Sequence, residues 1–388
     1  MKSIVTADYK DYEPNWPVSE RMAARAIVLV EDWKNLRPEP EAPLKPDDKI
    51  ALVYAKRLGY YKFPGGGINS DEDKVSALIR EVKEETGLDV IKESVVECAY
   101  DHRIHASDQY PGTIFSQDSY YYFCRVRTDS DGKLLVNEQH LDDYEKDDGF
   151  ELRLVSIKDA VENNVHFESE SFQKLDMIAR ETLIMEKISG MQEQMPRNYA
   201  KCVLERGVAK NPGPWREHSI AVAEAAEKIA RAVNENSQNG KQLLNPDIAY
   251  TYGLLHDIGR QEGYTYLAHV YDGYKFLLSL GYKDAARICI THSFNLKTTD
   301  DYIGKNDVTD AQFAEIKKLL AEEEFDDYDR LIQLLDSTCS ADGTKDLEKR
   351  MNDVKERYGY YPQEKWNKNF ELKEYFEKLA GRGFYEMI

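Results

Sequence analysis

A chain of 388 residues with 41% hydrophobic content can fold as a globular protein and is long for one core, so two domains are predicted. The net charge of −19 disfavours nucleic acid and anionic membrane surfaces as main partners, because both are bound through basic patches. The five cysteines are scattered without a CxxC pair, which disfavours a disulfide framework and predicts a reducing, cytoplasmic location.

The first half of the chain has the texture of an α/β or α+β domain. Short β-like runs are interrupted by one clear helix over 71–86, for which Ser70 and Asp73 form a capping signal. The proline-rich segment 38–43 is predicted to be a loop. The predicted strands are 24–30, 49–54, 95–100, 119–126 and 150–155.

The second half is predicted to be almost entirely helical. A helix over 169–188 ends at Ser189-Gly190, and Asn211-Pro212-Gly213-Pro214 breaks the pattern again. We place the domain boundary at the first break, which gives domains of residues 1–190 and 191–388. The further predicted helices are 215–233, 246–256, 268–280, 285–291, 310–323, 327–337 and 347–358.

The helix over 71–86 is unusually acidic on one side. Glu81, Glu84 and Glu85 share one helical face, because they are three or four residues apart, and like charges there cost a few tenths of a kcal/mol, roughly, per pair. Either this face is solvated or a cation binds to it. Three glycines, Gly65, Gly66 and Gly67, precede the helix and would let backbone approach a ligand closely.

The spacing favours the cation. From Gly66 the chain has five residues to Glu72, seven to Arg80-Glu81, then Glu84-Glu85 and Gly87-Leu88, and this segment resembles the Nudix box at every defined position. The resemblance implies a mixed sheet between helices and a loop–helix–loop that binds a divalent metal, Mg²⁺ or Mn²⁺, and a diphosphate. Oxygen ligands suit both ions.

By position in that box, the residues receive roles. Glu81, Glu84 and Glu85 would be metal ligands, Glu84, Glu85 and Arg80 would belong to the catalytic set, and Gly65, Gly66 and Gly67 would line the phosphates. The family often takes a general base from a later loop. Glu151, after an acidic stretch, is our candidate for that base, and a solvated loop acid is the alternative.

The second half concentrates histidines on predicted helices. Buried ionisable groups need partners, so an ordered set of four histidines and two aspartates suggests a metal site. The order His…His-Asp…Asp, with His256-Asp257-Ile258-Gly259, resembles the HD superfamily of metal-dependent phosphohydrolases. The resemblance implies that His218, His256, Asp257 and Asp336 hold one metal, and that His269 and His292 help hold a second.

The resemblance leaves several properties of the second site open. Asp257 would bridge two metals, which could be Mn, Fe, Co, Ni or Zn, since mixed nitrogen and oxygen ligands accept all of them. Arg260 either contacts phosphate or is a plain helix-end charge. The expected reaction is metal-assisted hydrolysis of a phosphate ester.

Together the two sites predict a bifunctional hydrolase. The first domain would cleave a phosphoanhydride of a nucleotide or nucleoside diphosphate derivative, and the second would hydrolyse a phosphate ester. The alternative is a nucleotide-sensing or scaffolding protein with only one active site. A small nucleotide is the expected partner and a homodimer is compatible with the sequence, whereas an RNA end is disfavoured by charge. No apolar run is long enough for a signal peptide or membrane span.

Overall fold

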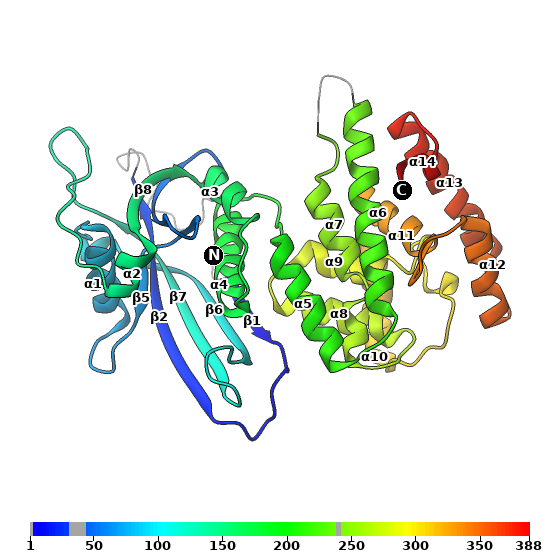
Figure 1. Ribbon diagram of the computed structural model, residues 1–388, viewed down its shortest axis with the longest axis horizontal. Helices are drawn as coiled ribbons and strands as arrows, with labels where there is room; N and C mark the ends of the chain where they lie inside the picture. The colour runs from blue at the N-terminus through cyan, green and yellow to red at the C-terminus, as the bar shows by residue number, and fades with distance from the viewer. Residues whose placement is uncertain (1–2, 31–43, 238–241) are drawn as a thin grey trace. The chain divides into compact units, whose positions relative to one another are not determined.

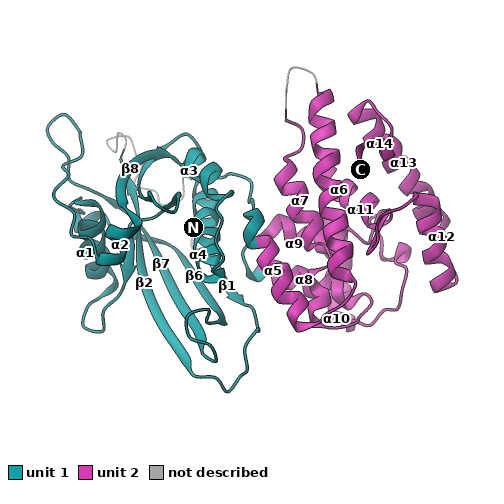
Figure 2. Ribbon diagram, in the orientation of Figure 1, with its two compact units in different colours: residues 1–199, 279–281 teal, residues 200–278, 282–388 magenta. Residues whose placement is uncertain are grey.

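The computed structural model describes residues 3–30, 44–237 and 242–388, so the predicted loop over 38–43 lies outside the described residues. Contacts within the chain divide it into two units (Figure 2). The first unit comprises residues 1–199 and 279–281, and the second comprises residues 200–278 and 282–388. The main division falls after Tyr199, within helix α5 (Arg197–Lys210), rather than at the Ser189-Gly190 break.

The first unit is built on a mixed sheet (Figure 1). Eight strands of the described residues join it in the order β1-β6-β7-β2-β3-β4, with β5 paired to β2 and β8 paired to β3. The β1–β6 and β2–β7 pairs are parallel and the others are antiparallel. The strands are β1 (Ser3–Asp8), β2 (Val18–Leu29), β3 (Lys49–Ala55), β4 (Tyr60–Lys62), β5 (Gly65–Gly67), β6 (Val96–Ala106), β7 (Ile114–Arg125) and β8 (Phe150–Ser156).

Helices cover both faces of this sheet. Side chains alternate along β2, so Ala26 and Val28 pack with α1 (Lys74–Thr86), while Ile27 packs on the other face with α3 (Ile157–Asn164) and α4 (Phe172–Ser189). Figure 1 shows α1 and α4 on opposite sides of the strands. The short helix α2 (Asp143–Asp148) leads into β8. The predicted mixed sheet between helices is therefore confirmed.

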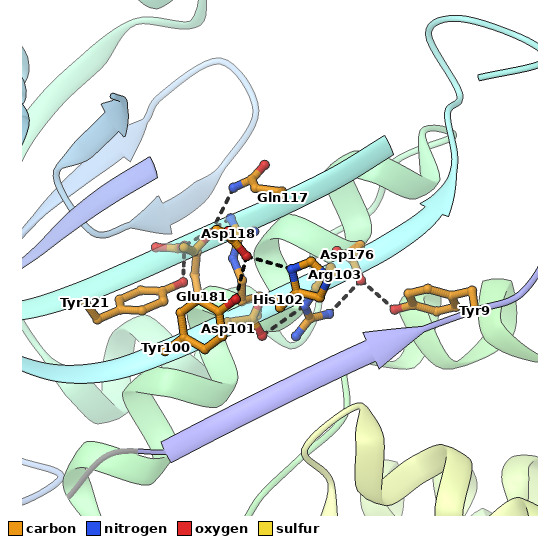
Figure 3. A network of polar contacts seen from close by, with 12 residues as sticks. Tyr9, Tyr100, Asp101, His102, Arg103, Gln117, Asp118, Tyr121, Asp176 and Glu181 are labelled. Carbon is orange, nitrogen blue, oxygen red and sulfur yellow. Dashed lines mark hydrogen bonds and ion pairs between the residues drawn. The ribbon is translucent and has the colours of Figure 1, made fainter. Parts of the chain in front are cut away.

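A buried polar network joins α4 to the sheet (Figure 3). Arg103 on β6 is fully buried and lies 3.0 Å from Asp101 and 2.6 Å from Asp176 on α4. Tyr9 and Tyr199 both donate to Asp176 as well, at 2.6 and 3.2 Å. Because a buried charge is stable only when it is paired, this network fixes α4 against the strands.

The second unit is mostly helical, as predicted. Its only strands among the described residues form a two-stranded hairpin, β9 (Cys339–Ser340) and β10 (Gly343–Thr344). Every helix that the model describes is too short or too polar to cross a bilayer. The helices are α6 (Trp215–Asn236), α7 (Pro246–Leu255), η3 (Ile258–Glu262), α8 (Ala268–Ser279), α9 (Lys283–Thr291), α10 (Asp310–Glu322), α11 (Asp327–Asp336), α12 (Leu347–Tyr358), α13 (Gln363–Ala380) and α14 (Phe384–Met387).

Several elements differ from the sequence-based expectation. The acidic helix begins at Lys74, because Asp73 and not Ser70 accepts the N–H groups of Val75 and Ser76. Strands β2, β6 and β7 are longer than the apolar runs that predicted them. The elements β1, α3, α5 and α13 were not predicted.

Candidate active sites

The glycine turn Gly65–Gly67 and helix α1 form the first site. Gly65 and Gly66 also line a pocket of the first unit. Gly65 has φ 140°, and a β-carbon there would lie 2.1 Å from the Ala24 carbonyl oxygen. A β-carbon on Gly66 would lie 2.3 Å from a carboxylate oxygen of Glu81. The glycines thus allow the backbone to pack directly against β2 and against the side chain of Glu81.

Arg80 links the carboxylates of the box. Its Nη1 atom donates to Glu81 at 2.8 Å and to Glu84 at 2.9 Å. Its Nη2 atom donates to Glu72 at 2.6 Å and to the Gly67 carbonyl at 3.0 Å. The guanidinium therefore holds three box carboxylates and the glycine turn together.

Glu85 lies deeper than the other box glutamates. Its side chain is 1% exposed, accepts the Gly65 N–H at 2.9 Å and forms an ion pair with Lys62. Burial raises the pKa of Glu85 to about 7, an effect that Lys62 only partly offsets. Burial also raises the pKa of Glu81, against the influence of Arg80. Glu81 and Glu85 have raised pKa values and belong to the same box as Glu84. Additional positive charge is therefore favourable at this site.

The donor set of this first site fits Mg²⁺ or Mn²⁺ chemically, because it consists of carboxylate oxygens. The box glutamates are nevertheless spread apart: among the described residues, only two groups gather three ligand atoms within 4.8 Å, and both lie in the second unit. In the first site Arg80 and Lys62 supply the positive charge instead.

The structure does not bring Glu151 to the first site. Its neighbour Phe150 lines the pocket, whereas Glu151 is not among the residues that line it. Glu151 pairs with Arg153, whose guanidinium lies 3.6 Å from the centre of the Tyr54 ring. Glu145, one helix earlier, is a buried carboxylate bonded to the Tyr144 hydroxyl, and its position could not be read from the sequence.

In the second unit the structure brings all six predicted ligands together. His218 on α6, His256 after α7 and Asp336 at the end of α11 meet, with His218 Nε2 3.1 Å from Asp336 Oδ1 and 3.2 Å from His256 Nε2. Asp257 Oδ1 lies 3.1 Å from His269 Nε2 and 3.7 Å from His292 Nε2. Two ligand groups result, and Asp257 belongs to both.

Backbone carbonyls orient the imidazoles. The Nδ1 atoms of His256, His269 and His292 donate to the carbonyls of Gly253, Tyr266 and Ile288. These bonds turn each Nε2 lone pair toward the centre, which is the usual arrangement for metal ligation. Burial, followed by repulsion from His256, lowers the pKa of His292 to about 3, so this imidazole is neutral, as a ligand must be.

Asp257 is the shared residue at this centre. Burial alone would raise its pKa, but Arg260 and His256 hold the pKa of Asp257 well below its usual range. Its Oδ1 atom is buried and makes no hydrogen bond within the described part of the chain. A buried anionic oxygen between histidine nitrogens fits a bridging metal ligand, so the residues present suit one or two divalent metals.

Arg260 and Gly259 shape the same centre. Arg260 donates to Asp257 at 2.6 Å, so its guanidinium is engaged with a predicted ligand rather than free at a helix end. A β-carbon on Gly259 would lie 1.9 Å from the His269 carbonyl oxygen. Glycine at this position therefore lets η3 approach the backbone of α8 and brings Asp257 close to His269.

A cavity of about 900 Å³ opens over these ligands. Its wall includes residues that the sequence did not single out, because they come from α12 and α13 far along the chain. Lys365 is the most notable: it is 7% exposed and donates to the Ser293 carbonyl at 2.6 Å, beside His292. Aromatic and basic side chains also line the cavity, among them Trp215, Tyr264, Tyr302, Tyr361, Arg350 and Arg357.

Family models match both parts of the chain: residues 43–175 match the NUDIX domain and residues 215–341 match the HD domain. The chain therefore carries a NUDIX domain followed by an HD domain, and both belong to hydrolase families, as predicted.

Individual relatives match parts of the chain. An RNA pyrophosphohydrolase of Marinomonas sp. (strain MWYL1) is 55% identical over 45 residues, which are 11% of this chain and 28% of that protein. A NUDIX hydrolase from Nitrosomonas europaea is 18% identical with a TM-score of 0.27, covering 46% of this chain and 93% of that one. A MutT structure from work on Aliivibrio salmonicida and Vibrio cholerae is 13% identical with a TM-score of 0.25, covering 44% and 97%.

Proposed function

We propose that the chain is a bifunctional metal-dependent hydrolase with separate reactions in its two domains. The NUDIX domain cleaves a phosphoanhydride of a nucleotide or nucleoside diphosphate derivative, and the HD domain hydrolyses a phosphate ester. The observation that carries the proposal is the convergence of four histidines and two aspartates, of which all but His256 line one cavity. The chain also carries a Nudix box that matches at every defined position.

The residues divide the work at each site. When bound, divalent metals polarise phosphate oxygens and lower the pKa of water. In the HD domain, His218, His256, Asp257, His269, His292 and Asp336 would hold these ions, and Lys365 and Arg260 add positive charge toward a phosphate. In the NUDIX domain, Glu81, Glu84 and Glu85 would exchange Arg80 and Lys62 for a metal with its diphosphate.

The test uses the full chain, a panel of nucleotides and phosphorus NMR to identify the bond broken. Glu84→Gln keeps side-chain shape and removes one charge, so anhydride cleavage should fall by about two orders of magnitude while ester hydrolysis continues. Asp257→Ala should lower ester hydrolysis while anhydride cleavage continues. Glu93→Gln, at an exposed position outside the box, is the matched control. If neither variant changes any activity, the assignment of both sites is wrong.

Two alternatives are tested by the same experiment. A nucleotide sensor with one active site would show one of the two reactions in the unmodified chain and only binding at the other site. The relative named an RNA pyrophosphohydrolase makes a triphosphate RNA end a second candidate substrate. RNA binding that weakens steeply with salt would favour it, because phosphate contacts release counterions.

A further inference from the structure

The pocket of the NUDIX domain extends well beyond the Nudix box. Its volume is about 900 Å³, and Gly65 and Gly66 line it. Side chains of β2, β7 and the N-terminal half of α4 form further parts of its wall. In the proposed function the box binds the diphosphate, so this remaining wall would contact the other groups of the substrate. Its lining residues include the basic side chains Arg21, Arg25, Lys174 and Arg180.

Two of these arginines are buried and share one carboxylate. Arg25 and Arg180 are 4% and 3% exposed, and Arg25 Nε and Arg180 Nη2 lie 3.2 and 3.5 Å from the same oxygen of Glu181. Glu181 also accepts the Tyr121 hydroxyl (Figure 3) and the Phe63 N–H, both at 2.9 Å. This carboxylate therefore accepts two hydrogen bonds and forms ion pairs with two guanidinium groups.

The arginines keep unused hydrogen-bonding capacity. Among the described residues, the Nε atoms of Arg25 and Arg180 are buried without a hydrogen-bond partner. The nearby Asp176 does not balance them, because Arg103 binds it at 2.6 Å. Arg21 precedes Arg25 by four residues on β2, so both side chains point to the same face of the sheet.

The other aspartates that line the pocket are Asp108, Asp147 and Asp148, of which Asp147 is exposed. Asp148 pairs with Arg57, and Asp108 accepts the Gln173 N–H at 2.8 Å at the start of α4. In a chain with a net charge of −19, the lining of this pocket carries six basic side chains and four aspartates, which is a local reversal of charge. Arginine forks of this kind suit phosphate oxygens.

We propose that this wall is a second anion subsite, in which Arg21, Arg25 and Arg180 bind a phosphate group of the substrate other than the one cleaved. The inference rests on the proposed function of the NUDIX domain and narrows its substrate to nucleotides with an additional phosphate. That phosphate either extends the polyphosphate chain or esterifies a sugar, and both present the same oxygens to the arginines.

Two matched pairs of ligands distinguish a phosphate in the polyphosphate chain from a phosphate on a sugar. ADP and ATP differ by one chain phosphate, and NADH and NADPH differ by one phosphate on a ribose. Binding to the full chain carrying Glu84→Gln, which slows turnover, is measured by titration calorimetry with Mg²⁺. In at least one pair the member with the additional phosphate should bind about tenfold tighter or more, since hydrogen bonds to charged groups contribute that much. The pair that shows the preference identifies the position of the phosphate.

Adding Arg180→Met or Arg21→Met should bring this ratio close to one. Arg21 is exposed, so its substitution tests the subsite without disturbing the buried network, and Arg127→Met is a control at an exposed position outside the pocket. Equal binding within both pairs, or a ratio that survives both substitutions, would overturn the subsite and leave the proposed function standing. Absence of binding and hydrolysis for all four ligands by the unmodified chain would count against the proposed function itself.

Discussion

At the scale of single residues, Glu186 on α4 is a carboxyl that forms no ion pair within the described residues. It is fully buried, its Oε1 atom accepts the Gln194 N–H at 3.0 Å, and its Oε2 atom has no hydrogen bond within the described residues. Burial raises the pKa of Glu186 well above its usual value. The folded chain therefore retains a proton that the unfolded chain releases at a lower pH.

This difference predicts a pH dependence of stability. Above the unfolded pKa the folded state binds more protons than the unfolded state, so the free energy of unfolding falls as the pH rises toward the folded pKa. Glu186→Gln removes the contribution of this carboxyl to the slope, so the substitution should be more favourable to stability at pH 8 than at pH 5. Urea denaturation at pH 5 and pH 8 measures it. A variant with the same pH slope as the unmodified chain would contradict the assignment.

Asp257 is the residue whose loss should matter most in the HD domain. Because it belongs to both ligand groups, Asp257→Ala should remove all transition metal, whereas His269→Ala should remove at most one ion per chain. Elemental analysis of the purified full-length variants gives the count, with thermal unfolding as the check on folding. A count of one ion in the unmodified chain, unchanged by His269→Ala, would leave a four-ligand site of His218, His256, Asp257 and Asp336.

At the scale of elements, the contact between η3 and α8 is the tightest constraint on the HD site. Gly259→Ala would place a β-carbon 1.9 Å from the His269 carbonyl and 2.5 Å from the Gly273 nitrogen. Moving two backbones apart should cost about 1–3 kcal/mol or more. It should also lower the metal count, because His269 moves away from Asp257.

Thermal denaturation and metal analysis measure both effects. Gly383→Ala is a matched control in the same unit: its φ is −63°, and the nearest atoms to an added β-carbon are side-chain atoms of Glu386 at 3.4 Å. Equal effects of the two substitutions would show that the contact at Gly259 has no special importance.

The elements also show what the sequence can predict. The box and the histidine motifs were predictable because their residues lie at fixed spacings within single helices or at helix ends. Helix α13 was not, because its buried face includes Lys365 and Asn369, which interrupt the apolar period. Strand β1 and the first half of β2 mix apolar and polar residues without a long apolar run, and their pairing with distant strands holds them in the sheet.

Site residues divide in the same way. His269 and His292 could be proposed from order alone, whereas Lys365 and Arg180 come to their pockets only through the packing of α13 and α4. Glu151 shows what position along the chain leaves open: it pairs with Arg153 on β8 and is not among the residues that line the pocket, so its role as a base stays a prediction.

At the scale of the whole molecule, the division into domains has a testable detail. Tyr199 belongs to the first unit and bonds to Asp176 at 3.2 Å, although it lies beyond the predicted boundary at 190. A fragment of residues 1–190 leaves Asp176 without this donor, and a fragment of residues 1–210 keeps it. Losing a buried hydrogen bond to a charged group costs about 1.5–3 kcal/mol, so the longer fragment should unfold at a higher temperature.

Calorimetry gives the unfolding temperature of both fragments. Tyr199→Phe in the longer fragment isolates the contribution of the hydroxyl group to that temperature. Residues 200–388 should fold separately if the second unit is a domain of its own. Aggregation of both parts, or loss of cooperative unfolding in both, would mean that the two units depend on each other for folding.

The register of the sheet has a consequence for the time the chain needs to fold. Ser3 pairs with Ala99 and Val18 with Ile114, so the parallel strands join segments far apart in the sequence. Such contacts form slowly because a long loop must close first, whereas helical units rich in local contacts fold faster. The slow-folding unit precedes the helical unit in the sequence, so it leaves the ribosome before the helical unit does. Refolding from urea should show two phases, with helical ellipticity recovering before the fluorescence of Trp16, beside the start of β2, and truncation of β1 should affect only the slower phase.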